Sequence, residues 1–280
     1  MMRLVYACFI FLCFLVFVSS CEKSPNGGIP FYMKMDSASV VYQNQPLNPV
    51  GITDVWVQTN TTNLGAYEIP TNFPVVQANP VTFLLSAGVW QSGQSTARNI
   101  YPFYDVDTFT LNATAGAKYT HHPKFTYLPA TIFAFPTETF EFNNDYDSMS
   151  IVPNGDSNVI YLGHHCGKMT TTLTDTDITA IQNITPYALP AGQEVWLEMD
   201  YKCDVPFWVG IIGNYNGSSP SVTQVLFVIP IPYWNKVYIK LSNIVGNLRA
   251  DTYQLYFEAL TPTGGTAGSV YLDNIKVVHF

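Results

Sequence analysis

One short stretch of the chain spaces acidic residues as acid–base chemistry on a sugar would require. Its alternate positions hold Glu194, Trp196, Glu198 and Asp200. Side chains two apart on a β-strand share a face and stand roughly 7 Å apart, and glycoside hydrolases place paired carboxylates about 5–10 Å apart. Trp196 interrupts the acidic series, so we assign no catalytic residue and interpret the face as a candidate ligand-binding surface. An ordinary solvent-facing strand is the alternative.

Aromatic residues are abundant, with 5 Trp, 18 Tyr and 18 Phe in the chain. An exposed aromatic ring on a sheet can stack on a sugar ring. Strand alternation directs Tyr238 and Tyr256 outward, as it does Trp196. We therefore predict that these three rings and the carboxylates of Glu194, Glu198 and Asp200 form the ligand-binding surface. We find no Gly-rich phosphate loop and no GxSxG motif.

Two of the five cysteines, Cys166 and Cys203, lie in the body of the chain and are candidates for a disulfide. In an oxidising compartment their pairing would stabilise the fold by roughly 4 kcal/mol in the chain-entropy model. The alternative is a pair of buried thiols. A zinc site is disfavoured, because the chain has no CxxC spacing.

The charge balance limits the classes of partner. The 280-residue chain has 12 basic and 20 acidic residues and a net charge of −8. A sparse, acidic charge argues against nucleic-acid binding and against electrostatic binding to anionic lipid. The excess of Tyr, Phe, Thr and Val over Lys, Glu and Arg favours strands, so we predict an all-β fold.

A first unit is predicted over residues 31–127, where short strands alternate with turn signals. Residues 53–58 alternate apolar and polar side chains, Asn60 to Asn63 form a polar turn, and residues 64–69 return as a strand. Short strands separated by turns at regular intervals are typical of a small β-sandwich.

This unit resembles a known family in four segments, namely 53–57, 64–70, 73–75 and 97–104. They are similar to the N-terminal domain of a group of Bacteroidota lipoproteins, in which an immunoglobulin-like or PEGA-like β domain follows a lipidated cysteine. The resemblance departs at the Asn60 to Asn63 turn, where such domains more often have an Asp-Gly turn. It implies a fold and a compartment but supplies no catalytic residue.

A second unit is predicted over residues 128–280. Its strands alternate at 194–201, 236–241 and 253–259, whereas residues 207–212 and 225–229 are near-continuous apolar runs, typical of central strands. Gly213 to Gly217 reads as a hairpin turn. In the closing segment, 270–278, Leu272 and Ile275 cannot share a face under strict alternation, which predicts a bulge at Asp273-Asn274.

The closing segment, of the form apolar-Asp-Asn-Ile-x-Val, resembles the last strand of jelly-roll modules, including many that bind carbohydrate. The resemblance implies a jelly-roll β-sandwich for the second unit. It also implies that Asp273 could join a structural calcium site, the only cofactor that we consider.

The N-terminus resembles a bacterial lipoprotein signal peptide. Residues 4–18 are almost wholly apolar, and Phe17-Val18-Ser19-Ser20-Cys21 resembles a lipobox. The apolar run is shorter than the roughly 20 residues of a spanning helix. We therefore predict cleavage before Cys21 and acylation of its thiol, with an uncleaved anchor as the alternative. Residues 22–30 would then form a flexible tether.

Together these patterns predict an all-β, two-domain lipoprotein. The expected parts are a signal peptide (1–20), a tether (21–30), an immunoglobulin-like or PEGA-like domain (31–127) and a jelly roll (128–280). We expect a lipid anchor in the outer membrane, with the periplasmic or surface orientation open. The leading hypothesis is a non-enzymatic protein that binds an envelope protein partner. The alternatives are a glycan-binding lipoprotein that uses an aromatic face of the jelly roll and, more weakly, a glycoside hydrolase.

Overall fold

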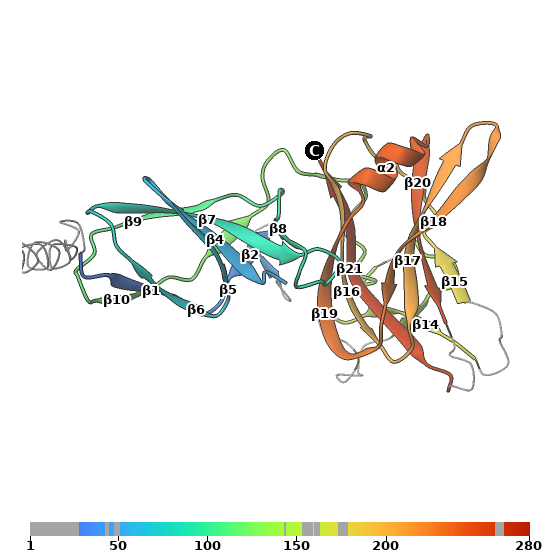
Figure 1. The fold of residues 1–280 in the computed structure, drawn as a ribbon. Coiled ribbons are helices and arrows are strands. Elements are labelled where there is room, and N and C mark those ends of the chain that lie inside the picture. Colours follow the sequence, from blue (N-terminus) through green and yellow to red (C-terminus); the bar gives the residue numbers. More distant parts are fainter. Residues whose placement is uncertain are drawn as a thin grey trace, which may run out of the picture.

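The computed structural model describes residues 28–42, 45–47, 51–142, 144–152, 159, 163–172, 179–260 and 266–280. Cys21 and the apolar segment before it lie outside these residues, so the lipid anchor remains a prediction. Within the described ranges, no helix is long and apolar enough to cross a membrane. The predicted all-β fold is confirmed, because the elements of the described ranges are strands apart from one short helix, α2 (Ser242–Leu248) (Figure 1).

Strands β1 to β11 lie between residues 31 and 126. They are β1 (Phe31–Met35), β2 (Ser39–Tyr42), β3 (Gln45–Leu47), β4 (Asp54–Thr59), β5 (Asn63–Glu68), β6 (Thr71–Val75), β7 (Val81–Trp90), β8 (Arg98–Ile100), β9 (Asp107–Leu111), β10 (Lys118–Thr120) and β11 (Lys124–Thr126). They form the sheets β10-β1-β6, β11-β2-β3 and β5-β4-β7-β8, with β9 also paired to β7. The alternation of β4 turns Val55 and Val57 into the core of this unit, beside Phe83 and Leu85. Its assignment as immunoglobulin-like or PEGA-like stays a prediction.

Strands β12 to β21 lie between residues 132 and 279. They are β12 (Ile132–Phe133), β13 (Ser150–Val152), β14 (Cys166–Thr170), β15 (Thr179–Gln182), β16 (Val195–Cys203), β17 (Phe207–Tyr215), β18 (Ser218–Val228), β19 (Ile231–Lys240), β20 (Thr252–Ala259) and β21 (Ser269–His279). One sheet has the order β13-β14-β21-β16-β19, with β12 on β21, and the other has the order β15-β20-β17-β18.

The order of these strands is that of a jelly roll. Successive strands from β14 to β21 alternate between the two sheets, except for the β17–β18 hairpin, which stays in one sheet. The resulting interleaved orders, β14-β21-β16-β19 and β15-β20-β17-β18, are those of two Greek keys wound into a double sheet. The predicted jelly-roll sandwich is therefore confirmed by the connectivity.

The core of the jelly roll follows the predicted alternation. Val195, Leu197 and Met199 of β16 point between the sheets and pack in one cluster with residues of β17 and β20. Fully burying side chains of this size stabilises a fold by about 1.5–3 kcal/mol each. The inward face of β16 therefore anchors the sandwich.

The predicted bulge at Asp273-Asn274 is also confirmed. The pairing of β16 with β21 shifts between Glu198, which faces Lys276, and Asp200, which faces Asp273. Asn274 adopts a φ of 50°, a left-handed conformation that Asn tolerates better than most residues. The extra residue lets both Leu272 and Ile275 of β21 point into the core.

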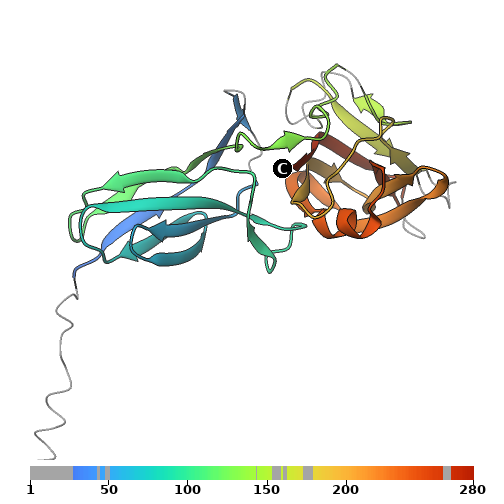
Figure 2. The same cartoon turned by 90° about the horizontal axis from the view of Figure 1, so that it is seen from above.

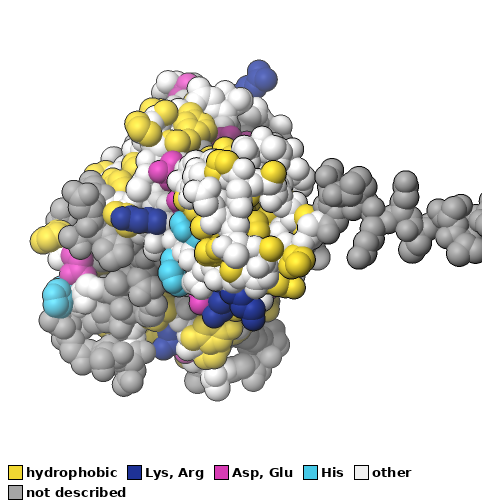
Figure 3. Space-filling model, turned by 90° about the vertical axis from the view of Figure 1, so that its left-hand side faces the viewer, with side chains coloured by type: hydrophobic (Ala, Val, Ile, Leu, Met, Phe, Trp, Pro, Cys, Tyr) yellow, Lys and Arg dark blue, Asp and Glu magenta, His cyan; other side chains and the backbone are white. Residues whose placement is uncertain are grey.

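The first unit packs end-on against the jelly roll (Figures 1 and 2). It covers part of the outer face of the sheet that contains β16, β19 and β21, where Gln91 forms a bridge with Tyr238. The sheet β15-β20-β17-β18 faces the opposite way (Figure 1). Figure 3 views the molecule from the end of the first unit, where charged side chains of both signs are scattered among hydrophobic ones.

Candidate functional site

The outward face of β16 is the contact surface between the two units. Trp196, Glu198 and Asp200 do lie on the face opposite the sandwich core, as predicted, but at most 1% of each is exposed. The prediction that this face is open to a ligand is therefore wrong, because the first unit covers it. Trp196 packs with Tyr101 and Val278 in a cluster that joins the two units.

Tyr238 is also part of this contact, which corrects its predicted exposure. Only 1% of the residue is exposed, and its hydroxyl lies 3.1 Å from that of Tyr104 in the first unit. Glu194 is the one predicted acid that remains partly exposed. It forms an ion pair with Lys240 at 2.8 Å and accepts a hydrogen bond from the indole of Trp196 at 2.7 Å.

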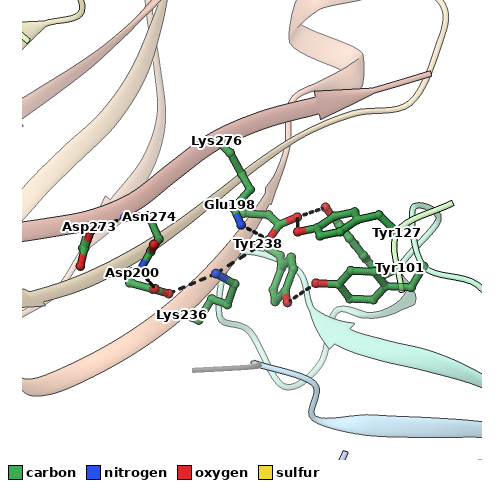
Figure 4. A network of polar contacts seen from close by, with 10 residues as sticks. Tyr101, Tyr127, Glu198, Asp200, Lys236, Tyr238, Asp273, Asn274 and Lys276 are labelled. Carbon is green, nitrogen blue, oxygen red and sulfur yellow. Dashed lines mark hydrogen bonds and ion pairs between the residues drawn. The ribbon is translucent and has the colours of Figure 1, made fainter. Parts of the chain in front are cut away.

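Glu198 binds two tyrosines from the first unit (Figure 4). The hydroxyls of Tyr101 and Tyr127 donate to its Oε1 atom at 2.6 Å and 2.7 Å. Hydrogen bonds to an ionised acceptor are roughly twice as strong as neutral ones. We call Glu198, these two tyrosines and the charged residues beside them the junction network.

Two lysines neutralise the acids of the junction network. Lys236 Nζ donates to Asp200 Oδ1 at 3.2 Å and lies 3.8 Å from Glu198 Oε2, while Lys276 Nζ lies 3.9 Å from that same oxygen. Glu198 Oε2 has no hydrogen-bond partner in the described structure, so these longer contacts are ion pairs only. Asn274 donates to the second oxygen of Asp200 at 2.8 Å.

Burial shifts the pKa values in this network. It lowers the pKa of Lys276 to about 8, although Glu198 opposes the shift. It also raises the pKa of Asp273 to about 8, so this carboxyl is mostly protonated at neutral pH. For Lys236, burial alone would lower the pKa, but Asp200 and Glu198 outweigh it and raise the pKa.

The burial of Glu198 and Asp200 excludes the hydrolase chemistry considered for this strand. A general acid or base must lie within hydrogen-bond reach of the substrate, and less than 2% of either residue is exposed. What the arrangement does instead is bind the two units together through charge-assisted hydrogen bonds.

The predicted disulfide is absent. Cys166 and Cys203 are both buried and neither forms a disulfide. They lie on β14 and β16, which are separated by β21, and strands two apart in a sheet are about 10 Å apart, beyond the roughly 7 Å that a disulfide can span. Burial raises the pKa of the Cys203 thiol to about 11.

The described residues supply no cluster of ligands for the calcium ion predicted at Asp273. They contain no group of three or more His, Cys, Asp and Glu side chains placed to hold a metal. Asp273 is 2% exposed and accepts a hydrogen bond from the Asn274 amide at 2.7 Å. A calcium ion at this position therefore remains a prediction.

The open aromatic surface lies on the other sheet. Phe207, Val209 and Ile211 of β17 point into the core, which turns Trp208 to the outer face. Trp208 is opposite Phe227 of β18, and the ring centroids lie 4.9 Å apart at an angle of 52°. Phe227 is 41% exposed and Trp208 is partly exposed.

Tyr256 lies on the same outer face but is only 5% exposed, so its predicted exposure is wrong. Its ring occupies the space above Gly210, where a Cβ atom would overlap it. Its hydroxyl has no hydrogen-bond partner in the described part of the chain. Two polar side chains lie beside it on the same face, Gln224 of β18 and Glu258 of β20. Gln224 Nε2 donates to Glu258 Oε2 at 3.2 Å.

We call this surface the sheet face. Its members alternate with core residues on β17, β18 and β20, and they are Trp208, Gly210, Gln224, Phe227, Tyr256 and Glu258. Sequence reasoning interpreted 207–212 as a strand buried on both sides and so missed Trp208. Strict alternation along this strand was the available signal, because it places Trp208 on the face opposite Phe207 and Val209.

No protein-family model matches the sequence, and a search of curated proteins finds no significant relative. Solved structures with a similar fold include a xylan-binding domain from CBM 22 (13% identity, 52% of this chain, 94% of that chain, TM-score 0.33). A family 11 carbohydrate-binding module from Clostridium thermocellum, in complex with a β-1,3-1,4-mixed-linked tetrasaccharide, gives 15% identity over 52% of this chain and 94% of that chain (TM-score 0.35).

The enzymatically active domain of bacteriophage CBA120 tailspike protein 4 is also similar (10% identity, TM-score 0.41), with 54% of this chain matching 22% of that chain. The likeness to all three is loose, and our assignment of the fold rests on the strand order.

Proposed function

We propose that the chain is a non-enzymatic binding protein that recognises an uncharged glycan on the sheet face of its jelly roll. The observation that carries the proposal is the Trp208–Phe227 pair, which stands partly exposed on the outer face beside polar side chains. Aromatic rings stack on the apolar face of a sugar, and adjacent amides and carboxylates bind its hydroxyl groups. Gln224 and Glu258 supply such groups beside the rings.

The charge of the chain supports an uncharged ligand. The net charge is −8, and the sheet face carries Glu258 as its acid. An acidic protein repels uronic acids and sulfated sugars at a distance. We therefore expect neutral oligosaccharides to bind better than acidic ones of the same length.

The position of the sheet face supports a role at a membrane. The face points away from the first unit and from the N-terminal end of the described chain (Figure 1). If Cys21 is lipidated, the first unit would act as a spacer that holds the sheet face away from the bilayer, in a Bacteroidota-type outer membrane. In that case, Cys21→Ala should move the protein from the membrane fraction to the soluble fraction of cells.

A second candidate function, binding of an envelope protein partner, is favoured by the edge strand β18. Val222 is 62% exposed on β18, and Ile229, just beyond its end, is 70% exposed. An exposed apolar edge is typical of a protein-interaction surface. The glycan experiment separates this candidate from the first.

The test is a glycan array followed by calorimetry with residues 28–280, comparing Trp208→Ala with Tyr233→Ala. Tyr233 is a matched control, because it is 63% exposed on β19 of the other sheet. We expect Trp208→Ala to weaken binding at least about tenfold, equivalent to ~1.4 kcal/mol, and Tyr233→Ala to leave it unchanged. A blank array across neutral plant, host and bacterial glycans would reject the proposal and favour a protein partner.

A further inference from the structure

The outer edge of β18 is the longest strand edge that the described part of the jelly roll leaves without a partner. β18 pairs with β17 on one side, and no backbone hydrogen bond among the described residues reaches its other side. The strand has 11 residues, Ser218–Val228, most of them exposed or half-buried. An edge of this kind presents a row of free backbone N–H and C=O groups, which is a template for another strand.

The other edges of the two jelly-roll sheets are covered or short. At β15, on the opposite side of the same sheet, the N–H of Asp147 donates to the carbonyl of Gln182 at 2.9 Å. At β19, the N–H of Ser92 in the first unit donates to the carbonyl of Tyr238 at 2.7 Å. The last edge strand, β13, has only three residues. Since strand edges are protected in stable monomers, the open edge of β18 favours pairing with a strand from another molecule.

The side chains of β18 suit an identical strand as that partner. Residues 218–228 contain no Asp, Glu, Lys or Arg, although the chain has a net charge of −8. A symmetric antiparallel pair places like residues close to a two-fold axis, where like charges opposite each other would be destabilising. A neutral strand avoids this repulsion. A different protein would be selected by complementary charges, and β18 offers no charged side chain for such selection.

Two irregular positions limit the pairing to the middle of β18. Pro220 lacks an N–H, and a register shift against β17 makes Val225 an extra residue. Residues 221–224 lie between them and pair regularly with β17. Within this segment Val222 is opposite Ile212 on the outer face and is 62% exposed. A two-fold axis beside Val222 would therefore bring its two copies together as an apolar centre.

The position of the first unit is compatible with such an axis. Opposite residues of an antiparallel pair point to the same face of the sheet, so the axis stands perpendicular to the sheet and the outer faces of the two copies join. The first unit packs on the other side of the jelly roll (Figure 1). Both first units, and both N-terminal ends, would then extend in the same direction, and two lipid anchors at Cys21 would reach one bilayer.

We propose that the chain forms a symmetric dimer in which the β18 strands of two copies pair antiparallel around Val222. The pair joins two four-stranded sheets into one sheet of eight strands. The proposal stands apart from glycan binding. It names a second copy, instead of a different envelope protein, as the occupant of this edge.

The test is native mass spectrometry of the full chain, released from detergent micelles at several protein concentrations. We expect a dimer for the original chain. Val222→Lys and Val222→Glu should each weaken the dimer at least about tenfold, because each places like charges opposite one another. An equal mixture of the two variants, one of them labelled with ¹⁵N, should restore a dimer that contains one copy of each.

Two controls show that the effect belongs to β18. Ile100 is 46% exposed on β8, an edge strand of the first unit, so Ile100→Lys and Ile100→Glu should both remain dimeric. Trp208→Ala should also remain dimeric, so a failure of the glycan proposal and a failure of the dimer are distinguishable. The restored mixed dimer would show that both Val222 variants fold.

Three results would overturn the dimer proposal. A monomeric original chain would leave the edge of β18 to a different protein. A dimer that survives both Val222 variants would place the contact elsewhere on the molecule. A mixture of the two variants that stays monomeric would show that their charges do not face each other across β18.

Discussion

At the scale of single residues, Glu198 is a fully buried carboxylate that the two units share. Its burial would be costly without partners, and Tyr101 and Tyr127 supply two hydrogen bonds to one oxygen. The sequence predicted the strand and the face on which Glu198 lies. It could not predict what covers that face, because the tyrosines are 97 and 71 residues away along the chain and no local pattern links them to Glu198.

Removing one of these hydroxyls should destabilise the fold. Tyr101→Phe deletes a 2.6 Å hydrogen bond to a buried carboxylate, and bonds to charged groups contribute about 1.5–3 kcal/mol. We expect urea denaturation to show a loss in that range. Tyr233→Phe, at an exposed site, is the control and should change the unfolding free energy by less than about 0.5 kcal/mol. A loss no larger than that of the control would contradict the assigned role of the hydroxyl.

The junction network should also give the stability a minimum near pH 8. The folded-state pKa of Asp273 is raised to about 8, so the folded state binds more protons below this value, and stability falls as pH rises from about 4 to 8. The pKa of Lys276 is lowered to about 8, so stability rises from about pH 8 to 10.5. Each group can contribute a slope of up to about 1.4 kcal/mol per pH unit.

Two variants separate these contributions in denaturation experiments at several pH values. Asp273→Asn should flatten the fall below pH 8, and Lys276→Met should flatten the rise above it. If both variants keep the pH profile of the original chain, the groups do not titrate in the predicted ranges.

At the scale of elements, the β17–β18 hairpin illustrates how far sequence reasoning reaches. The predicted turn is confirmed, because Asn216 and Gly217 connect Tyr215 to Ser218, and Gly217 has a φ of 82°. Counting back from that turn would place Trp208 opposite Val225. Two register shifts move it opposite Phe227 instead. Unlike the bulge at Asp273-Asn274, these two shifts have no clear signal in the sequence, so the pairing of Trp208 with Phe227 could not be predicted.

The same strand provides a test of how the sheet face is built. In Gly210→Ala the new Cβ atom would overlap the ring of Tyr256, and overpacking of this kind costs about 1–3 kcal/mol. We expect thermal unfolding to show that loss, together with weaker glycan binding. Gly246→Ala on helix α2 is the matched control, because its Cβ atom meets nothing within 4 Å, and it should be neutral or stabilising by up to about 1 kcal/mol. Equal effects of the two variants would refute the packing of Tyr256 over Gly210.

At the scale of the whole molecule, the junction network should make the two units unfold together. Hydrophobic contacts of Trp196 and Tyr238 join the units, and the tyrosine–Glu198 bonds cross between them. Separation would expose the apolar surface of this cluster to water and break both tyrosine–Glu198 bonds, so neither unit gains by opening first. We therefore expect a single transition by differential scanning calorimetry at neutral pH.

The double variant Tyr101→Phe/Tyr127→Phe leaves Glu198 without either hydroxyl donor, and it should split the profile into two transitions. Two separate transitions in the original chain, or one unchanged transition in the double variant, would mean that the junction does not couple the units. In that case the sheet face would not be held at a fixed orientation to the N-terminal end, and its proposed presentation away from a membrane would need another cause.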